Sequence, residues 1–415
     1  MAELLYNLFI GILGTVIKAL SWWHPKARKF VEGRKNVLSS LSAFREQFTG
    51  EVLWMHVSSL GEFEQGRPLL EAWKKEFPDY GIFLTFFSPS GFEVRKDYPI
   101  PDCITYLPID TPANARQFIE TLKPKITIFV KYDFWYNYLH RCVDLGIRVV
   151  FISALFRPEQ VYFNRGQHLF LPLFRKFDHF FVQNESSKAL LQKHGVDRVS
   201  ISGDTRLDRV VKIKTTSFEH ALIEQFAADR PVIVFGSIWY SDVNFLGSEL
   251  PRLRGNYRFI FAPHHIDQKS LDQFYQINPQ GTVFLSQVRE EIPSQIHTLI
   301  VDEIGSLAKI YRFARYAYIG GALHAGLHNT LEAAVYGLPV FFAHHPNNQK
   351  FEEAKGMEES GAAFGLKQAE QMTEIIQQMD ADDAAYQAAA GAAHAYVHQH
   401  AGATDLIMDH LKPWA

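Results

Sequence analysis

The strongest constraint on the fold comes from short apolar runs that recur along the chain in two separate sets. The runs are continuous rather than alternating, which is typical of strands buried on both faces of a parallel sheet, and helix-like stretches join them. We therefore predict an α/β chain with two doubly wound, Rossmann-like domains. The predicted strands are 52–57, 82–87, 126–130, 148–153, 179–182 and 199–202 in the first set, and 232–235, 259–262, 298–301, 317–319 and 340–342 in the second.

The segments around these two sets fit a two-domain chain. Residues 208–217 are polar and basic with little periodicity, and we interpret them as a linker. Residues 380–411 are rich in alanine, a strong helix former, and predict helix. The total of 415 residues also exceeds what one hydrophobic core usually serves.

Composition excludes several classes of protein. A hydrophobic content of 47% argues against general disorder. A net charge of −3 argues against nonspecific binding of nucleic acid, which depends on clustered cations. Cys103 and Cys142 are the only cysteines; they are too few for a disulfide framework, offer no zinc-type spacing and fit a reducing cytosol.

The first 25 residues predict a membrane anchor. Residues 4–23 are almost entirely apolar or small, long enough to cross a bilayer, and end at Trp22 and Trp23. Tryptophans followed by cations are the order expected at a membrane interface with a cytoplasmic flank. We predict an uncleaved anchor, either spanning the bilayer or lying in its interface; the alternative is an amphipathic helix packed on its own domain. The basic flank contains Lys26, Arg28, Lys29, Arg34 and Lys35.

The segment 54–62, Trp-Met-His-Val-Ser-Ser-Leu-Gly-Glu, is the first candidate for a functional site. It runs from a predicted strand into a tight loop, with a helix-like stretch at 63–77, and ligands of open α/β sheets bind beyond such strand ends. Gly61 lets the backbone approach a ligand, and Glu62 at this junction suits a general base. The alternative is that Glu62 is only a favourable acid in the first helical turn.

The segment 318–332 predicts a second site, formed by a buried strand, a glycine-rich turn and a helix N-terminus. Free N–H groups at such a terminus attract anions. Asn329 and Glu332 are also spaced as a capping pair, so a purely structural role is the alternative there. One strand-end loop in each half is the plan of an enzyme with a cleft between domains.

At these motifs the chain resembles the 3-deoxy-D-manno-octulosonic acid (Kdo) transferases, membrane-associated glycosyltransferases of lipopolysaccharide assembly. The resemblance covers nearly the whole chain and keeps the order of the motifs. It implies the GT-B architecture, in which two Rossmann-like domains face a cleft and the terminal helix commonly crosses back to the first. The motifs are Ser59-Leu-Gly-Glu62, Ser88-Pro-Ser-Gly91, Tyr106-Leu-Pro-Ile-Asp110, Lys131-Tyr-Asp-Phe-Trp-Tyr-Asn137, Ser202-Gly-Asp-Thr-Arg206, Phe235-Gly-Ser237, Ala262-Pro-His-His265, Val301-Asp-Glu-Ile-Gly305 and the Gly-Gly to His-Asn-x-x-Glu segment ending at Glu332.

The resemblance also implies a reaction and a domain plan. Residues 1–25 would be the anchor, 26–210 an acceptor-binding domain and 218–415 a nucleotide-sugar domain. Kdo would pass from CMP-Kdo to a lipid A precursor with inversion, without metal or cofactor, at the cytoplasmic face of the inner membrane. The expected partners are therefore CMP-Kdo, the lipid acceptor and membrane lipids, and no nucleic acid.

The same resemblance assigns residues to the site. Glu62 would be the base, and Asp133 stands where the family often has the second acid of a Glu-x-Glu pair; it would orient Glu62 or a Kdo hydroxyl, or be a structural acid. His264 replaces an arginine that is usual in the family, which weakens the expected charge on the donor phosphate. The remaining expected contacts are Ser59, Gly61 and Arg206 for Kdo or the acceptor, and Pro263, His264, Ile304, Gly305, Ser306, Asn329, Thr330, Leu331 and Glu332 for CMP.

Two other functions and one other site remain open from the sequence. A sugar-nucleotide epimerase also uses two Rossmann-like domains, although its soluble substrate needs no anchor. A non-catalytic membrane scaffold descended from a GT-B enzyme would not need Glu62, Asn329 and Glu332. The neighbours His344 and His345 invite a metal-site interpretation, but no carboxylate cluster accompanies them, which favours solvated loop histidines.

Overall fold

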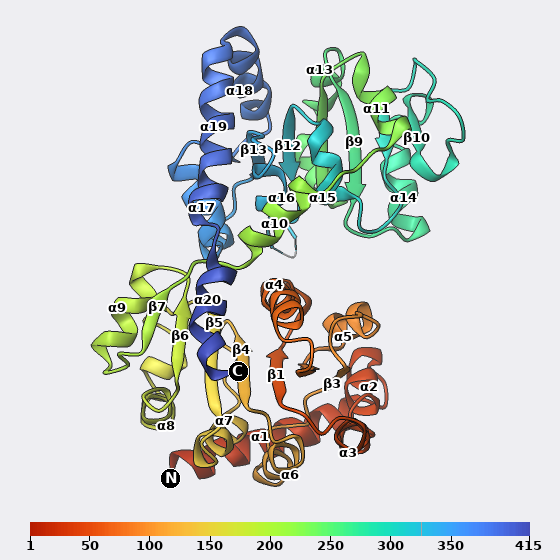
Figure 1. The fold of residues 1–415 in the computed structure, drawn as a ribbon. Helices are drawn as coiled ribbons and strands as arrows, with labels where there is room; N and C mark the ends of the chain where they lie inside the picture. Colours follow the sequence, from red (N-terminus) through yellow and green to blue (C-terminus); the bar gives the residue numbers. More distant parts are fainter. Residues whose placement is uncertain (325) are drawn as a thin grey trace. The chain divides into compact units, whose positions relative to one another are not determined.

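The computed structural model describes residues 1–324 and 326–415, and it divides into two compact units. Unit 1 contains Met1–Asp208 with Gly402–Ala415, and unit 2 contains Arg209–Ala401. Each unit is built on one seven-stranded parallel sheet with helices on its faces (Figure 1). The predicted α/β class with two doubly wound sheets is confirmed.

Unit 1 carries the sheet order β3-β2-β1-β4-β5-β6-β7. The strand order reverses between β1 and β4, and open α/β sheets bind ligands at such switch points. The strands are β1 (Val52–Val57), β2 (Gly81–Phe86), β3 (Cys103–Tyr106), β4 (Ile126–Val130), β5 (Arg148–Ala154), β6 (His179–Val182) and β7 (Val199–Ile201). The helices are α1 (Ala2–Leu20), α2 (Pro25–Glu32), α3 (Val37–Gln47), α4 (Leu60–Glu76), α5 (Pro89–Arg95), α6 (Pro112–Leu122), α7 (Tyr136–Asp144), α8 (Gln167–Phe174), α9 (Glu185–Lys193) and α20 (Ala403–Leu411).

Unit 2 repeats the plan with the order β10-β11-β9-β8-β12-β13-β14, so its switch point lies between β8 and β12. The strands are β8 (Val232–Ile238), β9 (Arg258–Pro263), β10 (Thr282–Phe284), β11 (Thr298–Ile300), β12 (Tyr316–Ile319), β13 (Val340–Ala343) and β14 (Ala363–Leu366). The helices are α11 (Ala221–Ala228), α12 (Tyr240–Leu246), α13 (Leu250–Arg254), α14 (Gln268–Tyr275), α15 (Leu307–Ile310), α16 (Leu331–Ala334), α17 (Glu352–Glu359), α18 (Glu370–Ala381) and α19 (Asp383–His400).

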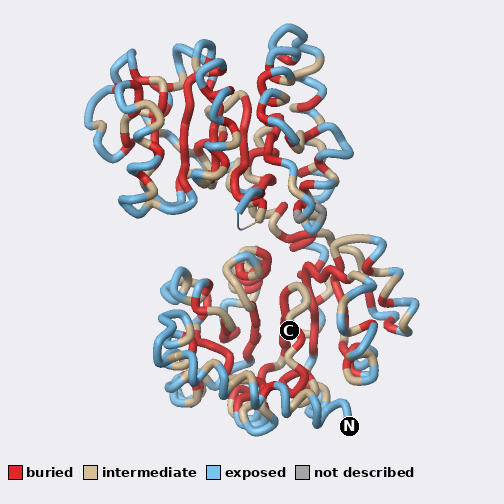
Figure 2. The backbone as a smooth tube through the Cα atoms, turned by 180° about the vertical axis from the view of Figure 1, so that it is seen from behind, coloured by how far each residue is buried: buried red, intermediate tan, exposed pale blue. Residues whose placement is uncertain are grey.

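The buried strands explain why continuous apolar runs mark the sheets. All six residues of β1, β2 and β9 are buried, and the tube in Figure 2 runs red along the middle of each unit. Two apolar clusters of unit 1 draw on alternate residues of the same strands, such as Trp54 in one and Leu53 and Met55 in the other. The sheet of unit 1 therefore has a core on both faces.

The boundary between the units differs from the expected linker and domain range. Residues 208–217 are largely helical, because α10 (Arg206–Thr215) runs through them. The alanine-rich helix predicted for 380–411 is interrupted at Gly402, whose φ of 106° is left-handed. The chain after Gly402 belongs to unit 1 instead of the expected 218–415 domain, since Asp208 accepts hydrogen bonds from Gly402 N at 2.5 Å and Thr404 N at 2.7 Å.

Helix α1 packs on unit 1 through one face only. Within the described residues it is the one helix long and apolar enough to cross a bilayer, a property that signal sequences and core helices share. Ile10 is its one buried residue, and Tyr6 is half-buried between Tyr136 and Phe170, with ring centroids 5.6 and 6.2 Å away. The opposite face exposes Leu4, Leu5, Leu8, Phe9, Ile12 and Val16.

Candidate active site

The β1–α4 junction of unit 1 holds Glu62 in a capping box with Ser59. Ser59 N donates to Glu62 Oε2 at 2.8 Å, and Glu62 N donates to Ser59 Oγ at 3.4 Å. Glu62 therefore has the structural role that was the alternative in the sequence analysis, that of an acid in the first turn of a helix. It uses only one carboxylate oxygen, because Oε1 accepts no hydrogen bond from any described residue. Glu62 therefore caps α4 with Oε2 and leaves Oε1 for another partner.

The surroundings of Glu62 make its carboxylate more basic than usual. Burial raises the pKa of Glu62 most, and the negative charge of Asp133 raises it further. The charge of Lys131 and the hydrogen bonds from Ser59 act in the opposite direction, and the net shift of this pKa is upward. A carboxylate with a raised pKa and a free oxygen is the arrangement expected of a general base.

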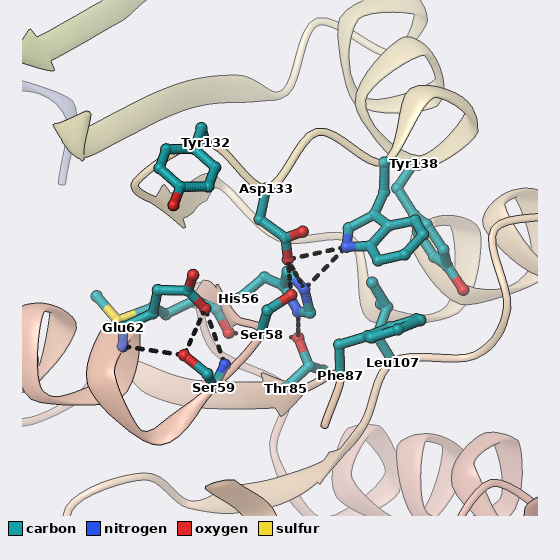
Figure 3. Close-up of polar contacts among 12 residues, drawn as sticks. His56, Ser58, Ser59, Glu62, Thr85, Phe87, Leu107, Tyr132, Asp133 and Tyr138 are labelled. Carbon is teal, nitrogen blue, oxygen red and sulfur yellow. Dashed lines mark hydrogen bonds and ion pairs between the residues drawn. The ribbon is translucent and has the colours of Figure 1, made fainter. Parts of the chain in front are cut away.

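Asp133 follows β4, across the strand switch point from Glu62, and is held by one oxygen. Oδ2 accepts from His56 Nε2 at 2.7 Å, from Trp135 Nε1 at 2.9 Å and from the hydroxyl of Ser58 (Figure 3). Lys131 begins this loop with a φ of 69°, an uncommon left-handed conformation for a residue other than glycine. Such strained positions cluster where a chain must present side chains to a ligand.

His56 is the residue at this site that sequence reasoning missed. It is completely buried, and its Nδ1 lies 2.8 Å from Thr85 Oγ1, which already accepts from Trp54 Nε1 at 2.9 Å. The Thr85 hydroxyl is therefore placed to donate to Nδ1, which suits the tautomer that donates from Nε2 to Asp133. The sequence signal that could have identified His56 is that it is a lone histidine inside an apolar strand.

Of the other residues expected in unit 1, Gly61 and Arg206 have contrasting environments. Gly61 is exposed, and a Cβ there would meet nothing closer than Ser59 Oγ at 3.9 Å, so space next to the backbone remains open. Arg206 binds Asp204, with Nη2 and Oδ2 2.6 Å apart, and Gln65 also donates to that carboxylate. The ion pair occupies part of the guanidinium that was expected to face a substrate.

Unit 2 gathers aromatic rings at the carboxyl ends of β8, β9 and β12. The His264 ring stacks on Trp239 with centroids 4.7 Å apart, and on His328 with centroids 4.3 Å apart. Trp239 Nε1 donates to His328 Nε2 at 3.1 Å. His324 and His265 pack edge-on against Trp239 at 4.0 and 4.8 Å. Trp239, His324 and His328 were not among the expected site residues.

His264 and His328 are poorly able to carry positive charge without an anion. Burial lowers the pKa of His328 to about 4, with neighbouring His264 and His265 adding to the effect. The pKa of His264 is also lowered, by burial first and then by His265 and His324. Asp242, nearby on α12, accepts through Oδ2 from Trp239 N at 2.8 Å and Gly321 N at 3.1 Å, and through Oδ1 from the Tyr318 hydroxyl at 3.2 Å. An added anion would reverse these pKa shifts.

The expected donor segment at 329–332 forms the capping pair considered from the sequence. Asn329 Oδ1 accepts from Leu331 N at 3.2 Å, and its amide donates to Glu332 Oε1 at 3.1 Å. Helix α16 is a single turn, so few peptide dipoles add up and the helix offers less to an anion than was expected. The hydroxyls of Ser306 and Thr330 are buried and have no hydrogen-bond partner among the described residues.

The remaining expected residues lie near strand ends of unit 2. Pro263 ends β9, Ile304 is 86% exposed, and Gly305 adopts a φ of 99°. His344, after β13, is also exposed. The described part of the chain contains no group of three or more histidine, cysteine or acidic side chains arranged around a metal position.

Comparisons with known proteins show which family this chain resembles. Residues 28–209 match the family model described as 3-Deoxy-D-manno-octulosonic-acid transferase (kdotransferase). The 3-deoxy-D-manno-octulosonic acid transferase of Chlamydophila psittaci is 27% identical over 72% of this chain and 71% of its own. Those of Aquifex aeolicus and Haemophilus influenzae are 26% and 22% identical, over 76% and 87% of this chain and 82% and 87% of theirs.

Solved structures agree on the fold. MurG of Acinetobacter baumannii is 16% identical, with a TM-score of 0.55 over 88% of this chain and 100% of its own. The UDP-GlcNAc 2-epimerase of Neisseria meningitidis is also 16% identical, with a TM-score of 0.61 over 88% and 100%. The two parallel sheets and these structures show a GT-B-like fold. The family match and the curated relatives indicate that the chain is a glycosyltransferase. Within that class, residues 28–209 match the Kdo transferase family model, and the chain is similar to Kdo transferases over most of its length.

Proposed function

We propose that the protein is an inverting glycosyltransferase that moves Kdo from CMP-Kdo to a hydroxyl of a lipid A precursor of the lipid IVA type, with Glu62 as general base. The observation that carries the proposal is the state of Glu62. Its Oε2 is fixed by Ser59, its Oε1 has no described partner, and burial with Asp133 raises its pKa. A base held this way needs no rearrangement before it accepts a proton.

The proposed step is a single displacement. The acceptor hydroxyl loses its proton to Glu62 while its oxygen forms a bond to the anomeric carbon of Kdo. The bond from that carbon to the phosphate oxygen breaks, and its electron pair leaves with CMP. Attack from the face opposite to the phosphate inverts the anomeric centre. Asp133, locked through Oδ2, would use Oδ1 to orient Glu62 or a Kdo hydroxyl.

The proposed donor site lies in unit 2. His264 and His328 would face the phosphate of CMP, which supplies the anion that makes their protonation favourable. The buried hydroxyls of Ser306 and Thr330 need hydrogen-bond partners, and a nucleotide offers them. Glu332 would accept from the ribose hydroxyls, a charge-assisted contact. The chemistry requires no redox cofactor, since no atom changes oxidation state.

We also propose that α1 attaches unit 1 to the cytoplasmic face of the inner membrane by lying in the interface. The face of α1 that contacts unit 1 carries Tyr6 and Ile10, and the opposite face is apolar and exposed. Trp22 and Trp23 follow it, 80% and 67% exposed. Exposed Lys26 and neighbouring cations suit anionic lipid headgroups. A helix that uses one face for its own domain is better suited to lying in the interface than to spanning the bilayer.

The test is a transfer assay with the full chain in lipid vesicles. CMP-Kdo and a lipid A precursor are supplied, and CMP release is followed together with the mass of the lipid. We expect CMP release that depends on the acceptor, and a lipid heavier by one or more Kdo residues. Release of CMP without lipid product, or conversion of a UDP-sugar to its epimer, would contradict the proposal. No turnover at all with a properly folded chain would favour a non-catalytic scaffold.

A further inference from the structure

Helix α7 begins without a cap of its own, and residues distant in sequence provide one. Its N-cap residue, Trp135, makes no side-chain capping bond. The amide of Tyr136 donates instead to the Tyr6 hydroxyl at 3.2 Å. The next two amides, of Asn137 and Tyr138, donate to Asp110 at 3.1 Å each. Three successive orphan N–H groups are thus satisfied by α1 and by the loop after β3.

Tyr6 and Asp110 also bind each other. The Tyr6 hydroxyl donates to Asp110 Oδ2 at 2.6 Å, and Asp110 is completely buried. Burial raises the pKa of Asp110 to about 6, although Tyr6 and the α7 amides oppose that rise. Asn7 adds a neighbouring contact, since its Oδ1 accepts from Asn137 Nδ2 at 2.9 Å. The inner face of α1 is therefore joined to α7 by specific polar contacts as well as by packing. Figure 1 shows the course of the two helices in unit 1.

The start of α7 continues directly from the loop that carries Asp133. Trp135 donates to Asp133 Oδ2 at 2.9 Å, and its ring packs on Phe87 with centroids 4.3 Å apart. Asp133 in turn is close enough to Glu62 to raise its pKa. A chain of contacts thus leads from Tyr6 through the first turn of α7 to Asp133 and Glu62. If the first turn of α7 frays, Trp135 loses its fixed position and Asp133 loses one of its three hydrogen-bond donors.

We propose that Tyr6 is a positioning residue: together with Asp110 it caps α7 and fixes the loop Lys131–Trp135, so that the apolar N-terminal helix completes the active site as well as contacting lipid. The inference rests on the proposed roles of Glu62 and Asp133. A helix that served only as a tether would need its outward apolar face and no hydrogen bond between Tyr6 and the buried Asp110. The inner and outer faces of α1 therefore have separable functions.

The test compares Tyr6→Phe with wild type, as full chains in vesicles. Phenylalanine keeps the ring contacts and removes the hydroxyl. We expect kcat to fall roughly 10- to 100-fold, because small misplacements at a reacting centre cost about that much. The KM for CMP-Kdo and the binding to vesicles should stay unchanged. The acid limb of the kcat–pH profile should move to lower pH, since Asp133 would act less on Glu62.

Tyr257→Phe is the matched control, because Tyr257 also donates to a carboxylate, that of Asp380 in unit 2. It should lose comparable thermal stability and keep the wild-type kcat. Hydrogen exchange gives a readout independent of activity: the amides of Tyr136, Asn137 and Tyr138 should lose protection in Tyr6→Phe. Wild-type kcat and unchanged protection would overturn the inference. A wild-type chain that releases no CMP would refute the proposed function instead, and the exchange measurement would still test the capping.

Discussion

His56 Nε2 and Asp133 Oδ2 lie 2.7 Å apart, which joins the end of β1 to the loop after β4 through a completely buried imidazole. Thr85 fixes the other ring nitrogen at 2.8 Å. The two loops at the switch point of unit 1 are therefore joined through the Asp133 carboxylate, to which the Ser58 hydroxyl also donates. This contact explains how Asp133 can be presented on a loop and still be fixed.

His56→Leu should lower the free energy of unfolding by about 1–3 kcal/mol, because Thr85 and Asp133 lose a buried hydrogen-bond partner. Urea titration measures the loss. His56→Gln, whose amide can reach one of the two partners, should recover part of it. Equal stability of wild type and the leucine variant would show that the network contributes nothing.

Glu62 should respond in opposite directions to its two charged neighbours. Asp133→Asn removes a negative charge, so the pKa of Glu62 falls and the acid limb of the kcat–pH profile moves to lower pH. Lys131→Met removes a positive charge, so this pKa rises and the limb moves to higher pH. The measured quantity is the pH at the midpoint of the acid limb, which can be read even if the maximal kcat changes. Shifts in the same direction would exclude Glu62 as the titrating group.

CMP should bind more tightly as pH falls from 8 to 6. The pKa of His328 is lowered to about 4, so the free protein carries neutral rings, and an anion favours their protonation. Each proton taken up with CMP strengthens binding by up to about tenfold per pH unit. His264→Arg should flatten this dependence, because arginine stays charged. His398→Arg, at an exposed position on α19, is the control and should leave it intact. A pH-independent affinity in wild type would refute the role of the rings.

The same pKa shifts set the stability of the protein without ligand. A histidine whose folded pKa is lowered contributes stability that is complete above its unfolded pKa, about 6.5, and is lost as pH falls through the folded value. Unit 2 should therefore melt at lower temperature as pH decreases from 7 to 4. Added CMP should raise the melting temperature more at pH 6 than at pH 8. Calorimetry with and without CMP checks both signs.

Membrane binding should depend on the outward face of α1. Leu8 and Phe9 are 61% and 60% exposed, and replacing both by Asn should weaken vesicle binding by roughly 100-fold, given about 1.5–3 kcal/mol for burying such a side chain fully. Val94→Asn removes an apolar side chain that is 55% exposed on α5, and should have no effect. Undiminished sedimentation of the double variant would exclude this face. High salt should also weaken binding, since exposed cations contribute to it.

The sheets could be predicted from the sequence because their strands are buried on both faces. Strands β3, β10 and β14 escaped prediction; each has three or four residues, some of them partly exposed. The position of Glu62 could be predicted because ligands of open α/β sheets bind beyond the carboxyl ends of the strands. Its connection to His56 could not, because His56 and Asp133 are 77 residues apart.

Contacts between distant residues account for the other misses. Tyr6 and Asp110 are separated by 104 residues, and no local pattern connects a tyrosine in an apolar helix with an acid after a short strand. Trp239 and His328, 89 residues apart, meet only because β8 and β12 are neighbours in the sheet. The helix expected near Asn329 proved to be one turn, Leu331–Ala334. Periodicity reports burial, and not which side chains meet.

Glu62→Gln is the most direct test of the central claim. Glutamine preserves the capping box, because its carbonyl can still accept from Ser59 N, but it cannot take a proton. We predict that kcat falls by about 10² to 10⁴-fold, while CMP affinity and melting temperature stay at wild-type values. Glu71→Gln, on the same helix and paired with Arg67, is the control and should retain turnover. Near-normal turnover of Glu62→Gln would contradict the account and move the base to Asp133, and loss of turnover together with loss of folding would leave Glu62 a structural cap alone.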